Sequence, residues 1–324
     1  MKNASCAIST GPETHLDHLA PICEALSIPL LVTEPDHEEL AQLFYPMVEV
    51  RYAPLQDLHL KALAEWDTII TTCKFWSLEL RPTLELIQKK EVRFVFTPHG
   101  HSDKEDFINN PIEQDIDLVY GPAMKETRRN TDAIEMGNIR HPFYLKYQNH
   151  FDRLAAPFFK SDKQTVLYAP TWQSTGSPTS FFNSVDTVVE QLSKDYNLLI
   201  KLHPLLEENN PALYHRAIGR YGSQATFIER FPAIYPLLEK TAIYLGDHSS
   251  IGYEFLAYDR PMYFLSEGGA LAKCGRPYRG RVDEDQKELS EMREARYAQV
   301  FKAPPLNGAE LLTAISRRHN LDLL

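Results

Sequence analysis

The sequence lacks several features that would assign a protein to a class at once. Its 324 residues include only four cysteines, which lie far apart and form no C-x-x-C pair. This spacing indicates neither a zinc knuckle nor a disulfide framework, and it predicts a reducing, cytoplasmic compartment. No run of about 18 apolar residues exists to span a bilayer. The N-terminus has no sustained apolar segment, so a secretory signal is not predicted.

Positive charge is also scarce, because 34 Lys and Arg stand against 44 Asp and Glu, a formal net charge of -10. An acidic chain without a basic run opposes binding to polyanions, so nucleic acid is not a predicted partner. Both G-x-G-x-x-G and G-x-x-x-x-G-K-[ST] are absent, so a phosphate site cannot be assigned from a dinucleotide fingerprint or a P-loop. The 43% hydrophobic and 24% charged residues are typical of an ordinary globular protein.

What the sequence does contain is an alternation of short Val-, Ile-, Phe- and Tyr-rich runs with longer segments of helical periodicity. This pattern is typical of βα units around a parallel sheet. One series occupies residues 1–150 and a second occupies residues 151–324, which predicts two α/β domains. We expect the last helix to pack back on the first domain. The two sheets are expected to face a cleft at the carboxyl ends of their strands, where parallel sheets bind ligands.

The predicted elements are as follows. The first domain has strands at 4–8, 29–32, 48–52, 68–72, 93–97 and 118–120, and helices that include 16–26 and 78–90. A polar helix at 144–153 is predicted as the connector. The second domain has strands at 165–168, 198–201, 226–228, 242–245 and 262–265, and helices at 182–194, 212–221, 234–239 and 251–257. A polar loop at 277–286 precedes helices at 289–300 and 309–317.

The first candidate site is the segment 98–104, PHGHSDK, directly after a predicted strand. Gly100 allows a tight turn that keeps the imidazole of His99 uncovered, and a histidine can take a proton at neutral pH. His99 is therefore a candidate base, with Gly100, Ser102 and Lys104 as candidates for contact with the acceptor. The alternative is a polar loop whose histidines are merely exposed.

Two further candidates lie at strand ends in the second domain. The segment 168–172, YAPTW, ends a strand and opens a polar loop at 173–180 that could fold over a ligand, which makes Thr171 a candidate. In the segment 201–204, KLHP, Lys201 could supply a point charge for phosphate, and His203 could hydrogen-bond a phosphate oxygen or protonate a leaving group. The alternatives are a packing tryptophan in a tight loop and a polar cap.

The most informative segment is 246–254, GDHSSIGYE, which runs from a strand through a polar turn into a helix. The hydroxyls of Ser249 and Ser250, with the free N–H groups of a helix start, could cradle a diphosphate without a metal. Asp247 belongs to the same turn, and Glu254 could accept hydrogen bonds from ribose hydroxyls. An N-cap without any ligand would use the same residue types.

The turn after the first strand adds Gly11 and His15 as candidates on the acceptor side. Five further histidines outside these segments have no supporting context and are predicted to lie at the surface. They are His37, His59, His150, His215 and His319.

Taken together, these segments resemble the CDP-glycerol glycerophosphotransferase family. The resemblance rests on PHG at 98–100, YAPTW at 168–172, KLHP at 201–204, and Asp247-x-Ser249-Ser250 followed by Arg260-Pro261, all in the family's order. It covers 98–261. The chain departs from the family at 101–104 and at His248, where tyrosine is common.

The resemblance implies a GT-B fold and transfer of glycerol phosphate, or a similar alcohol phosphate, from a CDP-linked donor to a hydroxyl of a polymer or lipid-linked acceptor. It implies that His99 is the base, that His203 is a second essential histidine and that Ser249 and Ser250 hold the donor phosphates. No cofactor and no metal are expected. A lipid-linked acceptor implies peripheral contact with the inner face of the cytoplasmic membrane.

Two alternatives stay open at this point. A nucleotide-sugar glycosyltransferase or a related 2-epimerase of the same fold would use the same serine turn, but it would release a nucleoside diphosphate rather than CMP. An inactive nucleotide-binding scaffold would need neither His99 nor His203.

Overall fold

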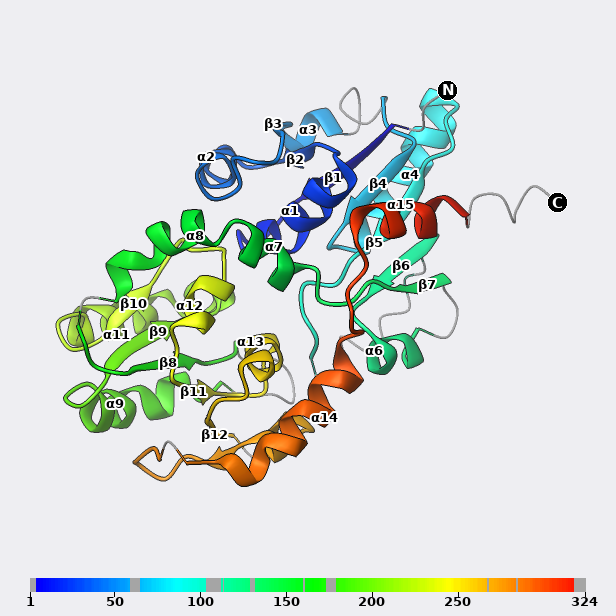
Figure 1. Ribbon diagram of the computed structural model, residues 1–324. Coiled ribbons are helices and arrows are strands. Elements are labelled where there is room, and N and C mark those ends of the chain that lie inside the picture. Colours follow the sequence, from blue (N-terminus) through cyan, green and yellow to red (C-terminus); the bar gives the residue numbers. More distant parts are fainter. Residues whose placement is uncertain are drawn as a thin grey trace. The chain divides into compact units, whose positions relative to one another are not determined.

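The computed structural model describes residues 4–58, 65–102, 112, 114–128, 132–159, 161–172, 179–266, 268–283 and 285–317. The chain divides into two compact units, each built on one parallel sheet (Figure 1). The first unit comprises residues 1–100, 109–146 and 300–324, and the second comprises 101–108 and 147–299. The chain therefore enters the second unit twice, for the short stretch 101–108 and again after Lys146, and it returns to the first unit for the last time at Val300.

The sheet of the first unit has seven parallel strands in the order β3-β2-β1-β4-β5-β6-β7. The order runs outward in both directions from β1 and β4, which is the doubly wound arrangement. The strands are β1 (Ser5–Ser9), β2 (Leu30–Val32), β3 (Val50–Tyr52), β4 (Thr68–Thr71), β5 (Arg93–Phe96), β6 (Ile116–Val119) and β7 (Asp132–Glu135).

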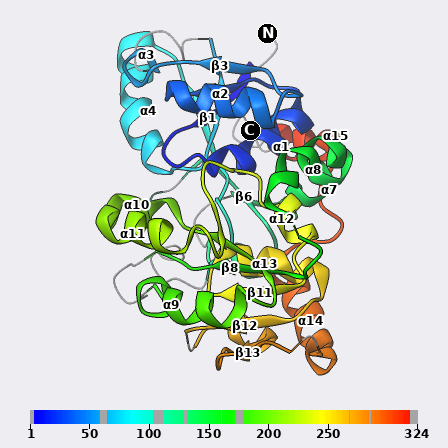
Figure 2. The same cartoon turned by 90° about the vertical axis from the view of Figure 1, so that its left-hand side faces the viewer.

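Helices α1 and α15 lie side by side in this unit, although they come from opposite ends of the chain (Figures 1 and 2). The returning segment is held by backbone hydrogen bonds from Lys302 to Tyr120 and from Leu306 to Met136. The helices of the unit are α1 (His15–Leu26), α2 (Pro35–Phe44), α3 (Leu55–Asp57), α4 (Phe75–Gln88), α6 (Pro122–Glu126), α7 (Arg140–Lys146) and α15 (Gly308–Arg317).

The sheet of the second unit has six parallel strands in the order β10-β9-β8-β11-β12-β13. Figure 2 shows β8, β11, β12 and β13 in succession. The strands are β8 (Thr165–Ala169), β9 (Asn197–Lys201), β10 (Thr226–Ile228), β11 (Ile243–Gly246), β12 (Met262–Phe264) and β13 (Arg276–Pro277).

The helices of the second unit pack with their apolar faces on this sheet. In α9, Phe181, Val185, Val188, Val189 and Leu192 are buried in one core with β8 and β9, at the spacing of a single helix face. The helices are α8 (Gln148–Ala155), α9 (Phe181–Leu192), α10 (Pro204–Asn209), α11 (Pro211–Tyr221), α12 (Tyr235–Glu239), α13 (Ser250–Phe255) and α14 (Ser290–Val300).

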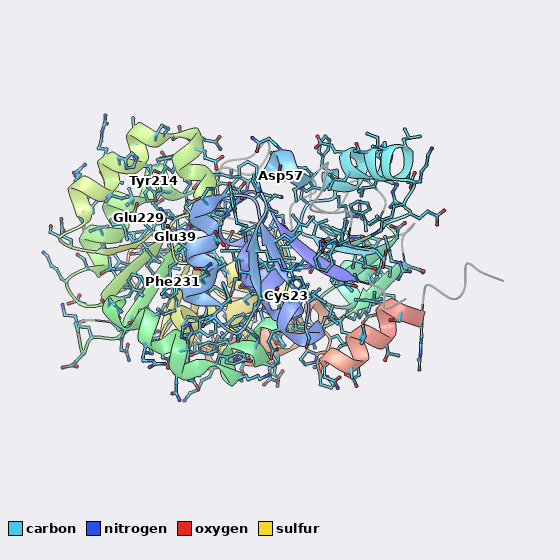
Figure 3. The ribbon with its side chains drawn as sticks, turned by 90° about the horizontal axis from the view of Figure 1, so that it is seen from above. Cys23, Glu39, Asp57, Tyr214, Glu229 and Phe231 are labelled. Atoms are coloured by element: carbon cyan, nitrogen blue, oxygen red, sulfur yellow. The ribbon has the colours of Figure 1, made fainter. Side chains whose placement is uncertain are left out.

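The rim of that core carries a polar contact that ties α11 to the end of β10. Tyr214 on α11 is buried, and its hydroxyl donates to a carboxylate oxygen of Glu229 at 3.3 Å; both residues are labelled in Figure 3. The tyrosine thus packs its ring inside while its hydroxyl has a partner, which is the usual condition for burying this side chain.

The structure differs from the predicted elements at three places. The connector at 144–153 is two helices, α7 and α8, because Tyr147 leaves the helical region with φ -115° and ψ 25°. The edge strands β7 and β13 were not predicted. The first is four residues long, and the second has two residues including Pro277, which was predicted to begin a loop. Such short edge strands give little periodicity to detect.

One surface prediction was wrong. His37 is buried on the inner face of α2 together with Leu40, Ala41 and Phe44, and its Nδ1 lies 3.4 Å from a carboxylate oxygen of Glu34. His150 is half-buried and His215 is exposed, while His59 and His319 lie outside the described residues.

Gly308 allows α15 to pack against α1, because a Cβ at this position would lie 2.0 Å from the carbonyl oxygen of Ala25. We predict that Gly308→Ala lowers the free energy of unfolding by about 1–3 kcal/mol through this overlap. Gly219 on α11 is a matched control, because a Cβ there meets nothing within 4 Å. Gly219→Ala should stabilise by roughly 0.5–1 kcal/mol through helix propensity. Calorimetric melting of both variants checks the prediction, and an unchanged or higher Tm for Gly308→Ala contradicts it.

Candidate functional site

The predicted site residues of each unit gather where its strand order reverses. In the first unit, Ile8 of β1 pairs with Thr71 of β4, which in turn pairs with Phe96 of β5. The residues that follow these three strands therefore emerge side by side at the carboxyl edge of the sheet. They include Gly11, Thr72 and His99.

The second unit repeats this arrangement. Ala169 at the end of β8 pairs with Gly246 of β11, and Tyr168 pairs with Ile200 of β9. Thr171, Asp247 and His203 thus leave three neighbouring strands at one edge. The point where the order of a doubly wound sheet reverses is where such sheets bind ligands.

His15 opens α1 in the first unit and is fixed by two oxygen atoms. Its Nδ1 lies 2.7 Å from the carbonyl oxygen of Thr10 and 3.0 Å from the hydroxyl of Thr72. Because a carbonyl oxygen can only accept, Nδ1 carries the proton and Nε2 keeps a lone pair. Burial, with a smaller contribution from His99, lowers the pKa of His15 to about 3, so the ring is neutral at neutral pH.

His99 follows β5, and its ring centroid lies 5.0 Å from that of His15. Its side chain reaches the surface, yet the surrounding protein atoms desolvate the ring and lower its pKa, while a hydrogen bond with the Thr72 backbone acts in the opposite direction. The next residue, Gly100, has φ 123°, which favours glycine. His99 is thus hydrogen-bonded to the Thr72 backbone and is mainly neutral at neutral pH.

His18 is a residue that sequence reasoning missed. It lies one turn after His15 on α1, is buried, and its ring stands edge-on to that of His99 with 6.5 Å between centroids. Its Nδ1 lies 2.8 Å from the hydroxyl of Tyr120, which donates to the carbonyl oxygen of Pro98 at 3.1 Å. Burial and the nearby Arg140 cation lower the pKa of His18. A chain of hydrogen bonds therefore supports the peptide before His99.

The helix was predicted to begin at residue 16, one residue after His15. In the structure it begins at His15, and the three-residue spacing to His18 is one that places both on the same side of a helix. Nothing in the sequence identified Tyr120, which lies 102 residues further along the chain than His18. The start of α1 is further held by the buried ion pair of Asp17 with Arg140, and by Tyr45, whose hydroxyl donates to Asp17 at 2.9 Å.

The other residues predicted on the acceptor side are placed as follows. Gly11 has φ 78°, and a Cβ there would lie 3.6 Å from Cε1 of His15. Ser102 is half-buried and belongs to the second unit with His101, whose ring meets that of Tyr253 on α13 edge-on at 4.5 Å. Lys104 lies outside the described residues.

Asp247 holds the polar turn of the second unit together. It is only 1% exposed, and its Oδ2 accepts hydrogen bonds from the backbone N–H groups of Thr171 at 3.0 Å and of Ser180 at 3.2 Å. These two residues flank the loop that follows β8. The carboxylate therefore fixes both ends of this loop against β11.

Ser249 is the N-cap of α13 in extended conformation, and Ser250 is the first helical residue. The Ser249 hydroxyl lies 3.2 Å from that of Tyr244, and both serine side chains are half-buried. Gly246 is required here, since a Cβ would lie 2.5 Å from the Tyr244 hydroxyl. The first N–H groups of a helix have no acceptor within the helix, so this turn offers N–H and O–H donors together.

His248 stands between Asp247 and Ser249 and is stacked on Phe264, with 5.4 Å between ring centroids. Its Nε2 lies 3.2 Å from the carbonyl oxygen of Ser266, so Nε2 carries the proton. Stacking on Phe264 and the hydrogen bond to Ser266 thus fix the His248 ring within the turn.

The remaining donor-side predictions are buried or cap a helix. Lys201 and Glu254 are buried at the end of β9 and on α13. His203 is the N-cap of α10, where its Nδ1 accepts from the backbone N–H of Leu205 at 3.2 Å, so the proton of a neutral ring lies on Nε2. The ring of Trp172 lies 6.1 Å from that of His203. His203 therefore caps a helix, as the alternative interpretation of this segment predicted.

Within the described part of the chain, no group of three or more His, Cys, Asp or Glu side chains has a geometry that could hold a metal ion. In the same residues, no helix is both long and apolar enough to cross a membrane.

Comparison with known proteins connects this arrangement to one family. Residues 146–268 match the family model described as CDP-glycerol:poly(glycerophosphate) glycerophosphotransferase. The teichoic acid poly(glycerol phosphate) polymerase of Bacillus spizizenii is 22% identical over 240 residues, which are 62% of this chain and 58% of that protein. The poly(ribitol-phosphate) polymerase of the same organism is 26% identical over 158 residues, 47% of this chain and 23% of that protein. The chain thus spans less than two thirds of these relatives.

Solved structures agree with the fold. The wall teichoic acid polymerase TagF has a TM-score of 0.68 at 16% identity, covering 98% of this chain and 88% of that one. The Staphylococcus aureus protein MnaA, solved with UDP, has a TM-score of 0.62 at 13% identity, covering 99% of this chain and 98% of that one.

The two doubly wound units, each with polar side chains at its strand-order reversal, define an α/β protein of the GT-B type. Through residues 146–268, the chain is similar to the CDP-glycerol glycerophosphotransferase family.

The Asp247 carboxylate gives a first prediction for this site. Asp247→Ala removes the acceptor of two buried N–H groups, so amide hydrogen exchange at Thr171 and Ser180 should accelerate, and the free energy of unfolding should fall by about 2–3 kcal/mol. Asp247→Asn keeps one side-chain oxygen and should retain most of the protection. Exchange rates that are the same in the alanine variant and the parent would show that this carboxylate does not hold the loop.

The neutral histidines give a second prediction. The folded pKa of His15, about 3, lies below the ordinary value, so between these values the unfolded chain binds more protons at this residue. His15 therefore lowers stability as pH falls from about 6.5 toward 3, and its contribution is fully present above that window. His15→Asn should show a smaller fall in Tm between pH 7 and pH 5 than the parent protein. An equal or larger fall in the variant contradicts the prediction.

Proposed function

We propose that the protein transfers glycerol phosphate, or a similar alcohol phosphate, from a CDP-linked donor to a hydroxyl of a polymer or lipid-linked acceptor and releases CMP. The observation that carries the proposal is the state of His99. It is held by the Thr72 backbone, stays mainly neutral, and lies at the carboxyl edge of a doubly wound sheet. The matching family model and the polymerase relatives support the same reaction.

In this reaction the acceptor oxygen forms a bond to the phosphorus that bears glycerol, and the bond from that phosphorus to the CMP oxygen breaks. The electron pair of the broken bond leaves with CMP. The hydroxyl proton passes to His99, because a neutral imidazole can accept a proton.

The second unit would hold the donor. The hydroxyls of Ser249 and Ser250 and the N–H groups at the start of α13 suit an uncharged cradle for phosphate oxygens. Lys201 would add a positive charge, and the Nε2–H of His203 would donate to a phosphate oxygen or to the leaving group. Asp247 supports the proposal indirectly, because it holds the loop at Thr171. Glu254 would accept hydrogen bonds from the ribose hydroxyls.

We also propose that no metal takes part, because a lysine, a helix start and a histidine N–H supply the groups that would stabilise phosphate charge. Full CMP release after treatment with EDTA would support this, and a loss restored by Mg²⁺ would contradict it. A polymer or lipid-linked acceptor would bring the protein to the inner face of the cytoplasmic membrane.

The donor is tested by calorimetry of CDP-glycerol, CDP-ribitol, CMP and a UDP-sugar against the protein. Saturable binding of a CDP-alcohol that is lost in Ser249→Ala/Ser250→Ala supports the proposal. Preferential binding of the UDP-sugar, with release of UDP, favours a sugar transferase or an epimerase.

His99→Ala should lower CMP release by about 100-fold or more while donor affinity stays nearly unchanged, because the imidazole acts on the acceptor proton. In the parent protein, the acid limb of kcat/KM should lie below pH 6.5, about the ordinary pKa of histidine, since that of His99 is lowered. His215→Ala, at an exposed position on α11, is the control and should release CMP at the parent rate. Unchanged turnover in His99→Ala would remove this residue from the role of base.

A further inference from the structure

Thr72 connects two imidazoles at the end of β4. Its hydroxyl lies 3.0 Å from Nδ1 of His15, and its backbone forms a hydrogen bond with the ring of His99. Thr72 itself is buried, so it is a fixed support rather than a group that meets a ligand. The two rings that it holds lie 5.0 Å apart with a tilt of 35°.

The hydrogen bonds of His15 decide what its ring can offer. Nδ1 donates to the carbonyl oxygen of Thr10, with 2.7 Å between the two atoms. The hydroxyl of Thr10 in turn accepts a hydrogen bond from the indole N–H of Trp76 at 2.7 Å. Nε2 is therefore an acceptor, and the described residues give it no partner. Its neutral state follows from the same burial that lowers the pKa of the ring.

Gly11 lies next to the ring of His15. A Cβ at position 11 would lie 3.6 Å from Cε1, the ring atom next to Nε2, and φ 78° favours glycine there. The described residues give His15 partners for Nδ1 only, and its side chain is half-buried rather than buried, so Nε2 can meet a ligand or water.

We propose that Nε2 of His15 accepts a hydrogen bond from a second hydroxyl of the acceptor, next to the hydroxyl that His99 deprotonates. The site would then select an acceptor that ends in two adjacent hydroxyls over one that ends in an isolated hydroxyl. His15 is a binding residue that sets specificity, and this inference rests on the proposed transfer reaction. Two neutral imidazoles with a common support are suited to a vicinal diol, because His99 can take the proton of one hydroxyl while His15 accepts a hydrogen bond from the other.

The test compares CMP release from CDP-glycerol with two acceptors, glycerol 3-phosphate, which has two adjacent hydroxyls, and 3-hydroxypropyl phosphate, which has one. The parent should prefer the diol in kcat/KM. In His15→Asn, the side-chain amide can still donate to the Thr10 carbonyl oxygen but has no acceptor at the Nε2 position. The preference for the diol should therefore fall by roughly tenfold, the usual value of one hydrogen bond. His15→Gln, with an oxygen that can reach that position, should regain part of it.

His215→Asn is the matched control and should keep the parent preference. A His15→Asn variant that loses activity equally on both acceptors, or that keeps the parent preference, overturns the inference while leaving the transfer reaction intact.

If the parent releases no CMP with either acceptor, the proposed function is contradicted. A binding measurement then tests the inference by itself. The protein is labelled with ¹⁵N-histidine, and the Nε2 resonance of His15 is identified as the one missing from the spectrum of His15→Asn. This resonance is followed while each acceptor is added. Glycerol 3-phosphate should move this resonance upfield, and 3-hydroxypropyl phosphate should move it less. Equal shifts, or no shift with the diol, overturn the inference.

Discussion

The parallel pairing of β1 with β4 and of β8 with β11 is the constraint on which both candidate sites depend. These are the strand pairs at which the order of each sheet reverses, so the loops that leave them run to opposite sides and leave the edge between them open. The pairing of Ile8 with Thr71 and of Ala169 with Gly246 then decides which loop residues meet. A shift of one residue in either register would turn these side chains to the other face.

Desolvation acts on the histidines that this register gathers. His15, His18 and His99 all have lowered pKa values because protein atoms surround them, and each ring therefore remains neutral at neutral pH. Hydrogen bonds to oxygen atoms then place the protons, as Thr10 does for His15. A cluster of this kind has lone pairs to offer instead of positive charge, which suits binding and deprotonation of hydroxyl groups rather than binding of anions.

The second unit uses one buried carboxylate for a different purpose. Asp247 was predicted at the donor phosphates, and the structure places its Oδ2 against the N–H groups of Thr171 and Ser180. Burying an anion is costly unless it is hydrogen-bonded, and these two amides satisfy one of its two oxygens. The serines of the same turn stay half-buried with their hydroxyls near the start of α13. The carboxylate therefore supports the turn, and the donors within the turn are Ser249 and Ser250.

The two α/β series and the strand ends that carry the polar segments could be predicted from the sequence, because apolar periodicity and turn residues are local signals. The support of Pro98 by His18 and Tyr120, the burial of His37 and the connection of His15 with His99 through Thr72 became evident only in the folded chain. These contacts join residues far apart in the chain, so no local pattern records them. The short edge strands β7 and β13 likewise depend on a neighbouring strand, since two to four residues have too little periodicity to specify a strand alone.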